Sequence, residues 1–525
     1  TKSNPLSLEN QKMSEETTPK ILDKLSKSAM SAKTTSMIVE TCYKTGTKSL
    51  KGRLIAPYQR DGVLWMLWRE RQHTGPKGGF LCDEMGLGKT IQTITTMLGN
   101  PKKASLIVTP KSIITQWKTE IERFAPNLKV MLFDGPGRKT NFEDFDVVIA
   151  PYSLTYKKKD NPDDTPLHGV KWDRIILDEA HEIRNIKSKM NISLSAMKSE
   201  IRWLLSGTPV FNTIKDFIAL GRFLGVSRQA VQGDLSNVRK KFVLRRTKED
   251  LAKFNKRLEL PPCDFENVEA EMLPAEWKLY EAVFTENQDI VRDLFKNSIN
   301  IGMHSMHILE CLLRSRQTAI HPQIYLDGVA KKKEECPEKW EHETKKIGML
   351  IDMVKEHPDE KTLVFCQFIG EMNLIQEELY QGNIKTYRID GSVSKDDRDK
   401  QISLFKSGSQ GSVFIIQIKA GGQGLNLQEA TRVYITAPSW NPATELQAIG
   451  RSHRTGQTKR VVVRKFIATG PSGEPTIEHS MMELQKAKSL VCSEVLDDPR
   501  LASQIPTKTG GGNLTIRDIK KIFQV

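Results

Sequence analysis

The chain has 525 residues, which is more than one hydrophobic core normally serves, so its length predicts at least two domains. Its residues are 38% hydrophobic and 27% charged, as in globular proteins, and no apolar run reaches the ~20 residues of a membrane-spanning helix. The net charge of +15 favours a polyanionic partner, nucleic acid before a membrane surface.

The cysteines and the first residues of the chain bear on disulfides, zinc binding and secretion. The seven cysteines form no C-x-x-C pair, so neither a disulfide framework nor a structural zinc site is predicted. The polar first residues, TKSNPLSLENQK, do not resemble a secretory signal. We therefore expect an intracellular protein with reduced thiols.

Residues 1–53 are predicted to form a basic disordered tail. They contain ten Lys and Arg against five Asp and Glu, with few aromatic residues. A segment of this composition buries too little apolar surface to fold alone.

Short apolar runs then alternate with amphipathic stretches. The first set of runs lies within 54–255, at 105–110, 146–152, 174–180 and 201–209. A second set lies within 346–475, at 362–368, 384–391, 412–418, 432–438 and 461–467. Buried strands that alternate with helices indicate an α/β fold with two lobes, each a doubly wound parallel sheet. Between them, 256–345 is rich in helix formers and is predicted to be a helical insertion.

The stretch LCDEMGLGKT (81–90) differs from a strict P-loop, because an Asp stands at its first Gly position. Its second half keeps two glycines that let backbone N–H groups approach phosphates, a Lys for the β- and γ-phosphates, and a Thr for Mg²⁺. A chance glycine-rich loop is the alternative. The predicted ATP-binding residues here are Asp83, Glu84, Met85, Gly86, Leu87, Gly88, Lys89 and Thr90.

The stretch RIILDEAH ends an apolar run with Asp178 and Glu179, 89 residues after Lys89. A carboxylate there can hold Mg²⁺, and a second can deprotonate the attacking water. The alternative is a surface Asp-Glu pair that closes a strand. We predict Thr90, Asp178 and Glu179 as the metal-binding residues, with Glu179 as the catalytic base.

The stretch QAIGRSHRTGQ (447–457) places Gln447, Arg451 and Arg454 on one face if it is helical. By itself it reads as a basic helix against DNA or solvent. With the phosphate loop and the acidic pair present, we predict that Arg451 and Arg454 act as arginine fingers on the γ-phosphate. The predicted catalytic residues are therefore Glu179, Lys89, Arg451 and Arg454.

The order of these blocks resembles that of the SWI/SNF-type ATPases of helicase superfamily two, over residues 54–490. LIAPYQRDGVLWML resembles their Q motif, LIVTPKSIITQWKTEIERF motif Ia, DEAH motif II, and LLSGTPVFN motif III. FVLRRTKEDL resembles the block after lobe one, and residues 420–457 resemble motifs V and VI. LTIRDIKKIF resembles the end of a RING-bearing branch, although no RING cysteines are present. The compact form is similar to that of viral members.

The resemblance implies two RecA-like lobes with ATP bound between them, Gln59 reading adenine, and a bracing helix within 476–525. Phe211 and Gln417 depart from the family pattern at positions thought to couple ATP to DNA. Ser112 could instead cap a helix, and Trp440 could instead close the lobe core. The DNA contacts that the resemblance implies are Lys111, Ser112, Lys419, Gly424, Asn426 and Trp440.

The expected function is a DNA-dependent ATPase that translocates on double-stranded DNA without separating its strands. Nucleosomes or RNA polymerase are the expected protein partners, and the nucleus, or a viral factory or virion for a viral protein, is the expected location. Alternatives are a strand-separating DNA or RNA helicase and a non-catalytic scaffold.

Overall fold

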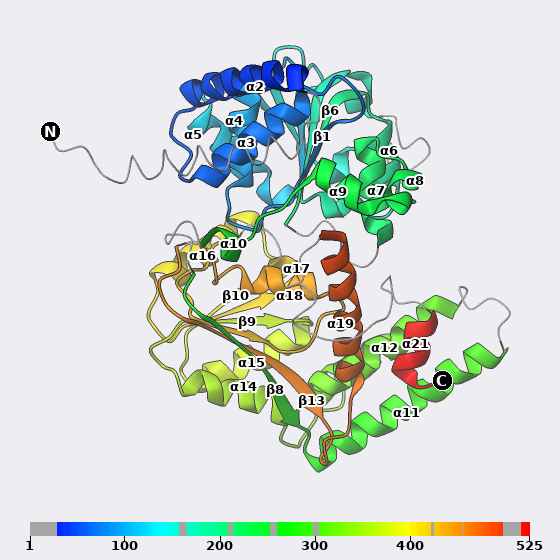
Figure 1. Cartoon of the computed structure of the whole chain (residues 1–525). Helices are drawn as coiled ribbons and strands as arrows, with labels where there is room; N and C mark the ends of the chain where they lie inside the picture. Colours follow the sequence, from blue (N-terminus) through cyan, green and yellow to red (C-terminus); the bar gives the residue numbers. More distant parts are fainter. Residues whose placement is uncertain are drawn as a thin grey trace. The chain divides into compact units, whose positions relative to one another are not determined.

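The computed structural model describes residues 29–156, 165–207, 214–252, 260–297, 304–421, 425–454, 456–496 and 516–525. The chain divides into two compact units (Figure 1). Unit 1 comprises Thr1–Glu259 with Glu494–Asp497, and unit 2 begins at Leu260. Within the described ranges, no helix has the length and apolarity needed to cross a bilayer.

Unit 1 is built on a seven-stranded sheet in the order β3-β4-β2-β5-β6-β1-β7, and every neighbouring pair is parallel. Its central strands are buried along their length, as expected of a sheet covered on both faces. The strands are β1 (Lys77–Leu81), β2 (Ser105–Thr109), β3 (Val130–Leu132), β4 (Val147–Pro151), β5 (Trp172–Asp178), β6 (Ser199–Leu205) and β7 (Val243–Leu244).

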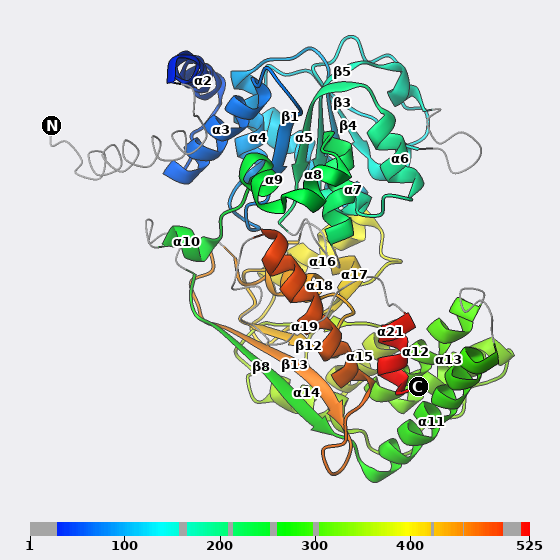
Figure 2. The same ribbon diagram turned by 45° about the vertical axis from the view of Figure 1, so that its right-hand side comes forward.

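Helices cover both faces of this sheet. Figures 1 and 2 show α3 and α4 on one side of it and α6 and α7 on the other. The described helices are α3 (Pro57–Glu70), α4 (Lys89–Gly99), α5 (Ile114–Phe124), α6 (Lys189–Ala196), α7 (Ile214–Leu224), α8 (Arg228–Gly233), α9 (Leu235–Phe242) and α10 (Lys248–Ala252). Short 3-10 turns include η1 (Lys111–Ile113), η2 (Tyr152–Leu154) and η4 (Ala180–Ile183).

Helix α2 (Ala29–Ser49) lies in the segment predicted to be a disordered tail, and that prediction is wrong for these residues. Val39 and Cys42 are buried against apolar side chains of α3. Gly46 approaches α4 so closely that a Cβ atom there would lie 2.6 Å from the Thr95 carbonyl oxygen. A few small or apolar residues at one interface therefore fix this helix, a signal too sparse to outweigh its polar composition.

Unit 2 holds a six-stranded parallel sheet in the order β10-β11-β9-β12-β13-β8. Both faces of its centre are buried, so the expectation of a second α/β lobe is confirmed. The strands are β8 (Cys263–Glu271), β9 (Thr362–Cys366), β10 (Thr386–Ile389), β11 (Val413–Gln417), β12 (Arg432–Ile435) and β13 (Val461–Thr469).

Strand β8 corrects the prediction that 256–345 is a helical insertion. All nine of its residues pair in register with β13 at the edge of the sheet. It was missed because its exposed face carries acids in place of an apolar pattern, which suits an edge strand. Asp264 accepts from Arg460 at 2.9 Å, and Glu266 from Arg464 at 3.1 Å.

Three helices of that stretch are described, over Pro274–Asn297, Ser305–Ile320 and Pro322–Lys333, and others cover the second sheet. The C-terminal α21 buries Ile522 and Phe523 against α11, with the Phe523 and Phe284 rings 5.6 Å apart. The helices of unit 2 are α11 (Pro274–Asn297), α12 (Ser305–Ile320), α13 (Pro322–Lys333), α14 (Lys345–Lys355), α15 (Ile369–Gln381), α16 (Lys395–Ser407), α17 (Ile418–Gly421), α18 (Pro442–Ile449), α19 (Ile477–Leu496) and α21 (Ile516–Phe523).

Candidate nucleotide site

The loop between β1 and α4 has the backbone of a phosphate-binding turn. Gly86 and Gly88 adopt φ values of 90° and 78°, which side chains with a Cβ atom rarely adopt. Gly88 caps α4, so the loop leads into the positive end of that helix. Lys89 follows directly, and its Nζ donates to the Asp83 carbonyl oxygen at 2.8 Å.

The Gln59 side chain of α3 packs against this loop. It is 2% exposed, its Oε1 accepts from the Ile55 backbone N–H at 2.8 Å, and its Nε2 donates to the Leu87 carbonyl oxygen at 3.4 Å. A Cβ atom on Gly88 would lie 2.5 Å from Gln59 Nε2. The structure thus brings the predicted adenine reader and the phosphate loop together.

Asp83 shows why this loop departs from a strict P-loop. Its carboxylate is fully buried and accepts from Arg246 Nε at 2.9 Å and from Gln92 Nε2 at 3.1 Å. The Arg246 guanidinium also lies 5.3 Å from the Tyr58 ring centroid. Asp83 therefore ties the loop to α4 and to the chain after β7, a task that glycine cannot perform.

Glu84 makes a second tie to the same segment. Its carboxylate accepts from the Lys248 backbone N–H at 2.9 Å and pairs with Lys248 Nζ at 3.1 Å. The sequence prediction assigned no role to Arg246 or Lys248. The signal available was FVLRRTKEDL, a run of basic residues directly after a strand.

The acidic pair stands at the end of β5. Asp178 Oδ2 accepts from Trp117 Nε1 at 2.6 Å, and Oδ1 accepts from the Glu179 backbone N–H at 3.0 Å. Burial, with the Glu179 charge beside it, raises the pKa of Asp178 to about 6, although Trp117 and Lys89 oppose the shift. Because Lys89 acts on this carboxylate, the phosphate loop and the acid lie within electrostatic reach.

Glu179 itself occupies the left-handed region, with φ 49° and ψ 50°. Such a conformation costs a side chain about 1–3 kcal/mol and is frequent at functional sites. The Glu179 carboxylate lies 3.3 Å from His181 Nδ1. The strand that ends at Asp178 is thus followed at once by a left-handed residue and the short turn η4.

Sheet topology explains how residues so far apart in sequence meet. β6 separates β1 from β5, and all three are parallel, so their carboxyl ends share one edge of the sheet. Gly207 follows β6, and a Cβ atom there would lie 3.5 Å from the Met85 side chain.

The residues at this edge suit Mg²⁺, which prefers oxygen ligands and is usually held by one or two carboxylates plus substrate phosphates. Asp178 supplies a partly buried carboxylate, and Thr90 supplies a hydroxyl in the first turn of α4. Across the residues that the structure describes, no cluster of three or more His, Cys, Asp or Glu offers a complete protein cage. A metal bound with nucleotide fits this set better than one held by protein alone.

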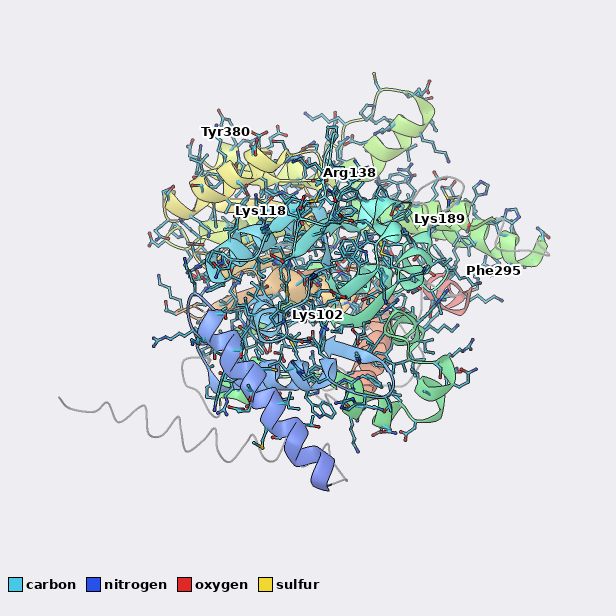
Figure 3. The ribbon with its side chains drawn as sticks, turned by 90° about the horizontal axis from the view of Figure 1, so that it is seen from above. Lys102, Lys118, Arg138, Lys189, Phe295 and Tyr380 are labelled. Atoms are coloured by element: carbon cyan, nitrogen blue, oxygen red, sulfur yellow. The ribbon has the colours of Figure 1, made fainter. Side chains whose placement is uncertain are left out.

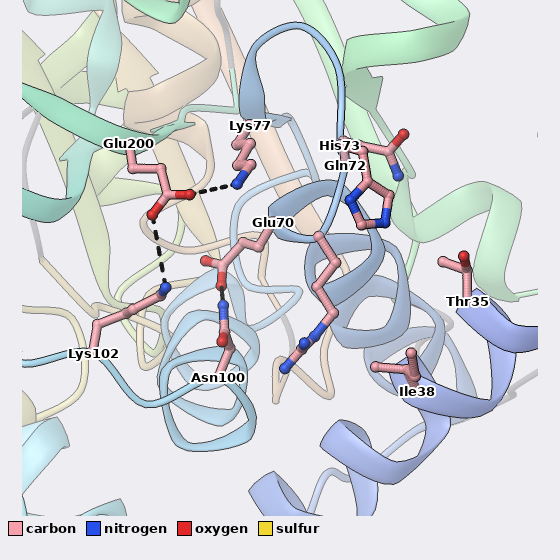
Figure 4. A pocket seen from close by; sticks show the side chains of 10 residues that line it. Thr35, Ile38, Glu70, Gln72, His73, Lys77, Asn100, Lys102 and Glu200 are labelled. Atoms are coloured by element: carbon pink, nitrogen blue, oxygen red, sulfur yellow. Dashed lines mark hydrogen bonds and ion pairs between the residues drawn. The ribbon is translucent and has the colours of Figure 1, made fainter.

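A pocket of about 250 Å³ lies at the opposite edge of the same sheet (Figure 4). Lys77, the first residue of β1, and Lys102 both pair there with Glu200, at the start of β6. Because the phosphate loop follows the other end of β1, this pocket is separate from the candidate nucleotide site.

In unit 2, Arg451 and Arg454 follow α18 in a turn. The prediction of a single helical face with Gln447 is wrong, because α18 ends at Ile449 and Gly450 caps it. Arg451 is 2% exposed, and its Nη1 donates to the Leu425 carbonyl oxygen at 3.5 Å. Arg454 Nη1 donates to the same oxygen at 3.3 Å, and burial lowers the pKa of Arg454.

The predicted DNA contacts differ in exposure. The Lys111 side chain is 73% exposed, with Nζ 3.7 Å from Asp134, and Ser112 beside it is exposed too. Ser112 is not the N-cap of α5, which begins at Ile114. In unit 2, Lys419 and Asn426 are exposed.

Trp440 is half-buried and packs against the core beneath α11 and α19, with the Arg316 guanidinium 5.4 Å from its ring. Gln417, one of the departures from the family pattern, accepts from the Gly391 backbone N–H at 3.1 Å. Gly424 and Phe211 lie outside the described residues.

Comparison with known families gives two matches. Residues 58–229 match the SNF2-related domain, and residues 345–456 match the helicase conserved C-terminal domain.

Individual relatives cover most of the chain. It is 31% identical to a putative ATP-dependent helicase/translocase of Bacillus subtilis, over 88% of this chain and 50% of the relative. It is 29% identical to a probable global transactivator of Orgyia pseudotsugata multicapsid polyhedrosis virus, over 89% and 94%. It is 29% identical to a probable chromatin-remodeling complex ATPase chain of rice, over 87% and 42%.

Thus the chain spans half or less of these two cellular relatives and nearly all of the viral one. Among solved structures, the Sulfolobus solfataricus SWI2/SNF2 ATPase core in complex with dsDNA is 27% identical. That comparison covers 90% of this chain and 97% of the other, with a TM-score of 0.39.

Proposed function

We propose, because the chain belongs to the SNF2-type ATPases of helicase superfamily two, that it hydrolyses ATP under stimulation by double-stranded DNA and moves along the duplex. The observation that carries the ATPase proposal is the shared sheet edge of unit 1, where the phosphate loop follows β1 and the partly buried Asp178 ends β5. A non-catalytic scaffold has no need of a partly buried acid at the same edge as a phosphate-loop lysine.

In this proposal the backbone N–H groups at Gly86 and Gly88, with Lys89, bind the phosphates, and Gln59 binds adenine. Thr90 and Asp178 hold Mg²⁺, which neutralises phosphate charge when bound. Glu179 accepts the proton of the attacking water, and its left-handed backbone conformation is of the kind frequent at functional sites.

Arg451 and Arg454 are proposed to supply positive charge to the γ-phosphate from unit 2. Guanidinium groups suit this role because they stay charged and bind phosphate oxygens in pairs. Two arginines within four residues, both near one backbone carbonyl, can act together as a pair.

DNA is proposed to contact both units through Lys111, Ser112, Lys419, Gly424 and Asn426. Contacts of this kind are made to the phosphate backbone, so binding should depend weakly on sequence and steeply on salt. The net charge of +15 supports a polyanionic partner.

The test is ATP hydrolysis measured side by side with duplex DNA, single-stranded DNA, RNA and nucleosomes. Strongest stimulation by a duplex, with displacement of a third strand from a triplex but no unwinding of a forked duplex, is expected. Stimulation by RNA alone, or strand separation, would show that the chain is a helicase instead. No hydrolysis with any of them would revive the scaffold alternative.

Proteins bound to DNA are the proposed cargo of this movement, with nucleosomes or an RNA polymerase as the candidates. The expected location is then a compartment that holds duplex DNA, either the nucleus or a viral factory or virion. A nucleosome-sliding assay and a stalled-polymerase release assay distinguish the two cargoes.

A further inference from the structure

The carboxylate of Asp178 is held from more than one direction by groups of unit 1. Trp117 Nε1 donates to Oδ2 at 2.6 Å, and the Glu179 backbone N–H donates to Oδ1 at 3.0 Å. The Tyr152 hydroxyl donates to the carbonyl oxygen of Asp178 at 2.8 Å. Both carboxylate oxygens and the peptide of this residue therefore have a fixed donor.

Of the two donors to the carboxylate itself, Trp117 is the one that comes from another element of the fold. An indole has a single N–H donor, and when it is buried that donor needs an acceptor. Here the acceptor is the carboxylate predicted to bind Mg²⁺, and a hydrogen bond to a charged group in a buried site is short and strong.

The indole cannot turn freely away from this partner. Trp117 is 2% exposed and packs within the core that includes Ile107, Ile121 and Ile176. Close packing of this kind fixes the rotamer, so the position of the N–H follows the position of α5 itself.

Helix α5 also leads directly from the predicted DNA-binding segment. Lys111 and Ser112 lie in η1, and α5 begins at Ile114, so Trp117 is one helical turn from its start. One turn of helix therefore joins η1 to the Trp117 indole.

We infer that Trp117 is a positioning residue for the proposed reaction, which fixes the orientation of the Asp178 carboxylate and links it to whatever binds at Lys111 and Ser112. The inference rests on the proposed function and adds a route within unit 1 by which DNA acts on the nucleotide site. It assigns the stimulation by DNA to one side chain.

Replacing Trp117 in the full chain with 3-benzothienylalanine tests the positioning role, because this residue keeps the bicyclic shape and removes only the N–H donor. The affinity for a fluorescent ATP analogue is measured with Mg²⁺ and with EDTA. We expect about tenfold weaker binding in Mg²⁺, from the loss of one hydrogen bond to a charged group, and no change in EDTA. Affinities within twofold of the natural chain in both conditions would overturn the inference.

Two further variants test whether the loss comes from the missing N–H donor or from any change in α5. Trp117→Phe also removes the donor and should show the same selective loss in Mg²⁺. The control is Lys118→Ala, on the same helix, whose side chain is 38% exposed and pairs with Glu122 at 3.5 Å (Figure 3). Exposed pairs of this kind contribute little, so this variant should match the natural chain. An equal loss in Lys118→Ala would show that any change in α5 suffices and would overturn the assignment to Trp117.

The link to η1 is tested by combining the Trp117 replacement with Lys111→Ala. The measured quantity is the change in nucleotide affinity when a short duplex is added, which requires no hydrolysis. If Trp117 carries the link, the two changes are non-additive, whereas additive effects would overturn it.

Failure of the proposed function is distinguishable from failure of this inference. A natural chain that binds nucleotide in a Mg²⁺-dependent way but hydrolyses none with any nucleic acid contradicts the proposed function. The binding measurements still decide the role of Trp117 in that case.

Discussion

In unit 1 the carboxylates of Asp178 and Asp83 accept hydrogen bonds of 2.6 and 2.9 Å, whereas in unit 2 Arg451 and Arg454 reach a shared carbonyl oxygen at 3.5 and 3.3 Å. Hydrogen bonds of the first kind are strong, and those near the upper distance limit are weak. Under the proposed function, Arg454 therefore gives up only a weak contact to Leu425 when it binds a phosphate. The carboxylates of unit 1, by contrast, are held firmly in the fold.

The largest effect is expected on hydrolysis, from the proposed arginine pair of unit 2. Arg454→Ala should lower kcat roughly 10³- to 10⁵-fold while ATP affinity and the melting temperature change little, because its contact in the fold is weak. Steady-state hydrolysis, nucleotide binding and thermal unfolding measure these three quantities. A large loss of ATP binding with normal turnover would contradict the arginine-finger role.

Glu179→Gln should come next, with a fall in kcat of roughly 10²- to 10⁴-fold and retained ATP binding. The amide cannot accept the proton of water, but it keeps the size of the side chain. Single-turnover hydrolysis with saturating duplex DNA measures the loss. Normal hydrolysis would show that Glu179 is not the base.

In unit 1, a substitution at the phosphate loop should instead lower the stability of the fold. Asp83→Ala removes a fully buried carboxylate and leaves the half-buried Arg246 without it, and breaking a buried ion pair costs about 3–5 kcal/mol. Chemical denaturation of the full chain should show the first transition shifted to lower denaturant. The control is Glu200→Ala at the opposite edge, where the acid is 48% exposed and pairs with surface lysines (Figure 4). Equal shifts in the two variants would show that the loss does not depend on the burial of Asp83.

The smallest effect concerns pH. Burial lowers the pKa of His321 in unit 2 from 6.5 to about 4. The unfolded chain therefore binds a proton more readily, and the stability that neutral His321 provides at neutral pH is lost as pH falls from about 6.5 toward 4. His321→Asn keeps an acceptor for the Gln323 backbone N–H at the start of α13 and should flatten this decline in thermal unfolding. An unchanged pH profile would contradict the assignment.

Asp178 should contribute to stability in the opposite direction. Its pKa is raised from 3.8 to about 6, so the stability it provides is greatest in acid and is lost as pH rises through 6. Lowering the pH therefore stabilises the fold through Asp178 and destabilises it through His321. Asp178→Asn and His321→Asn measure the two contributions separately.

The sequence predicted the buried parts of both sheets, because strands covered on two faces require continuous apolar runs, as in 105–110 and 412–418. The sequence-based prediction failed for segments that few apolar residues hold in place. The edge strand β8 is fixed by its ladder with β13, and α2 by a narrow interface around Gly46. Neither segment therefore shows a strong apolar pattern in the sequence.

The residues of the candidate site also differ in how readily the sequence reveals them. Residues 83–90 and the pair Asp178 and Glu179 could be proposed from the sequence because each motif is local. Trp117 lies 61 residues from Asp178, and Arg246 lies 163 residues from Asp83, and only the folded sheet brings these partners together. The arginine pair could also be proposed from the sequence, but its backbone conformation could not, because Gly450 ends the helix early.

Strand β8 has a mechanical consequence. The chain enters unit 2 at Leu260, and the ladder with β13 begins at Cys263, so a pull on the connection reaches the second sheet through this strand. When the pull runs along the strand, all nine paired residues share it, and the bonds need not break one at a time. The acidic edge strand is therefore a force-resisting attachment of the chain to the second sheet.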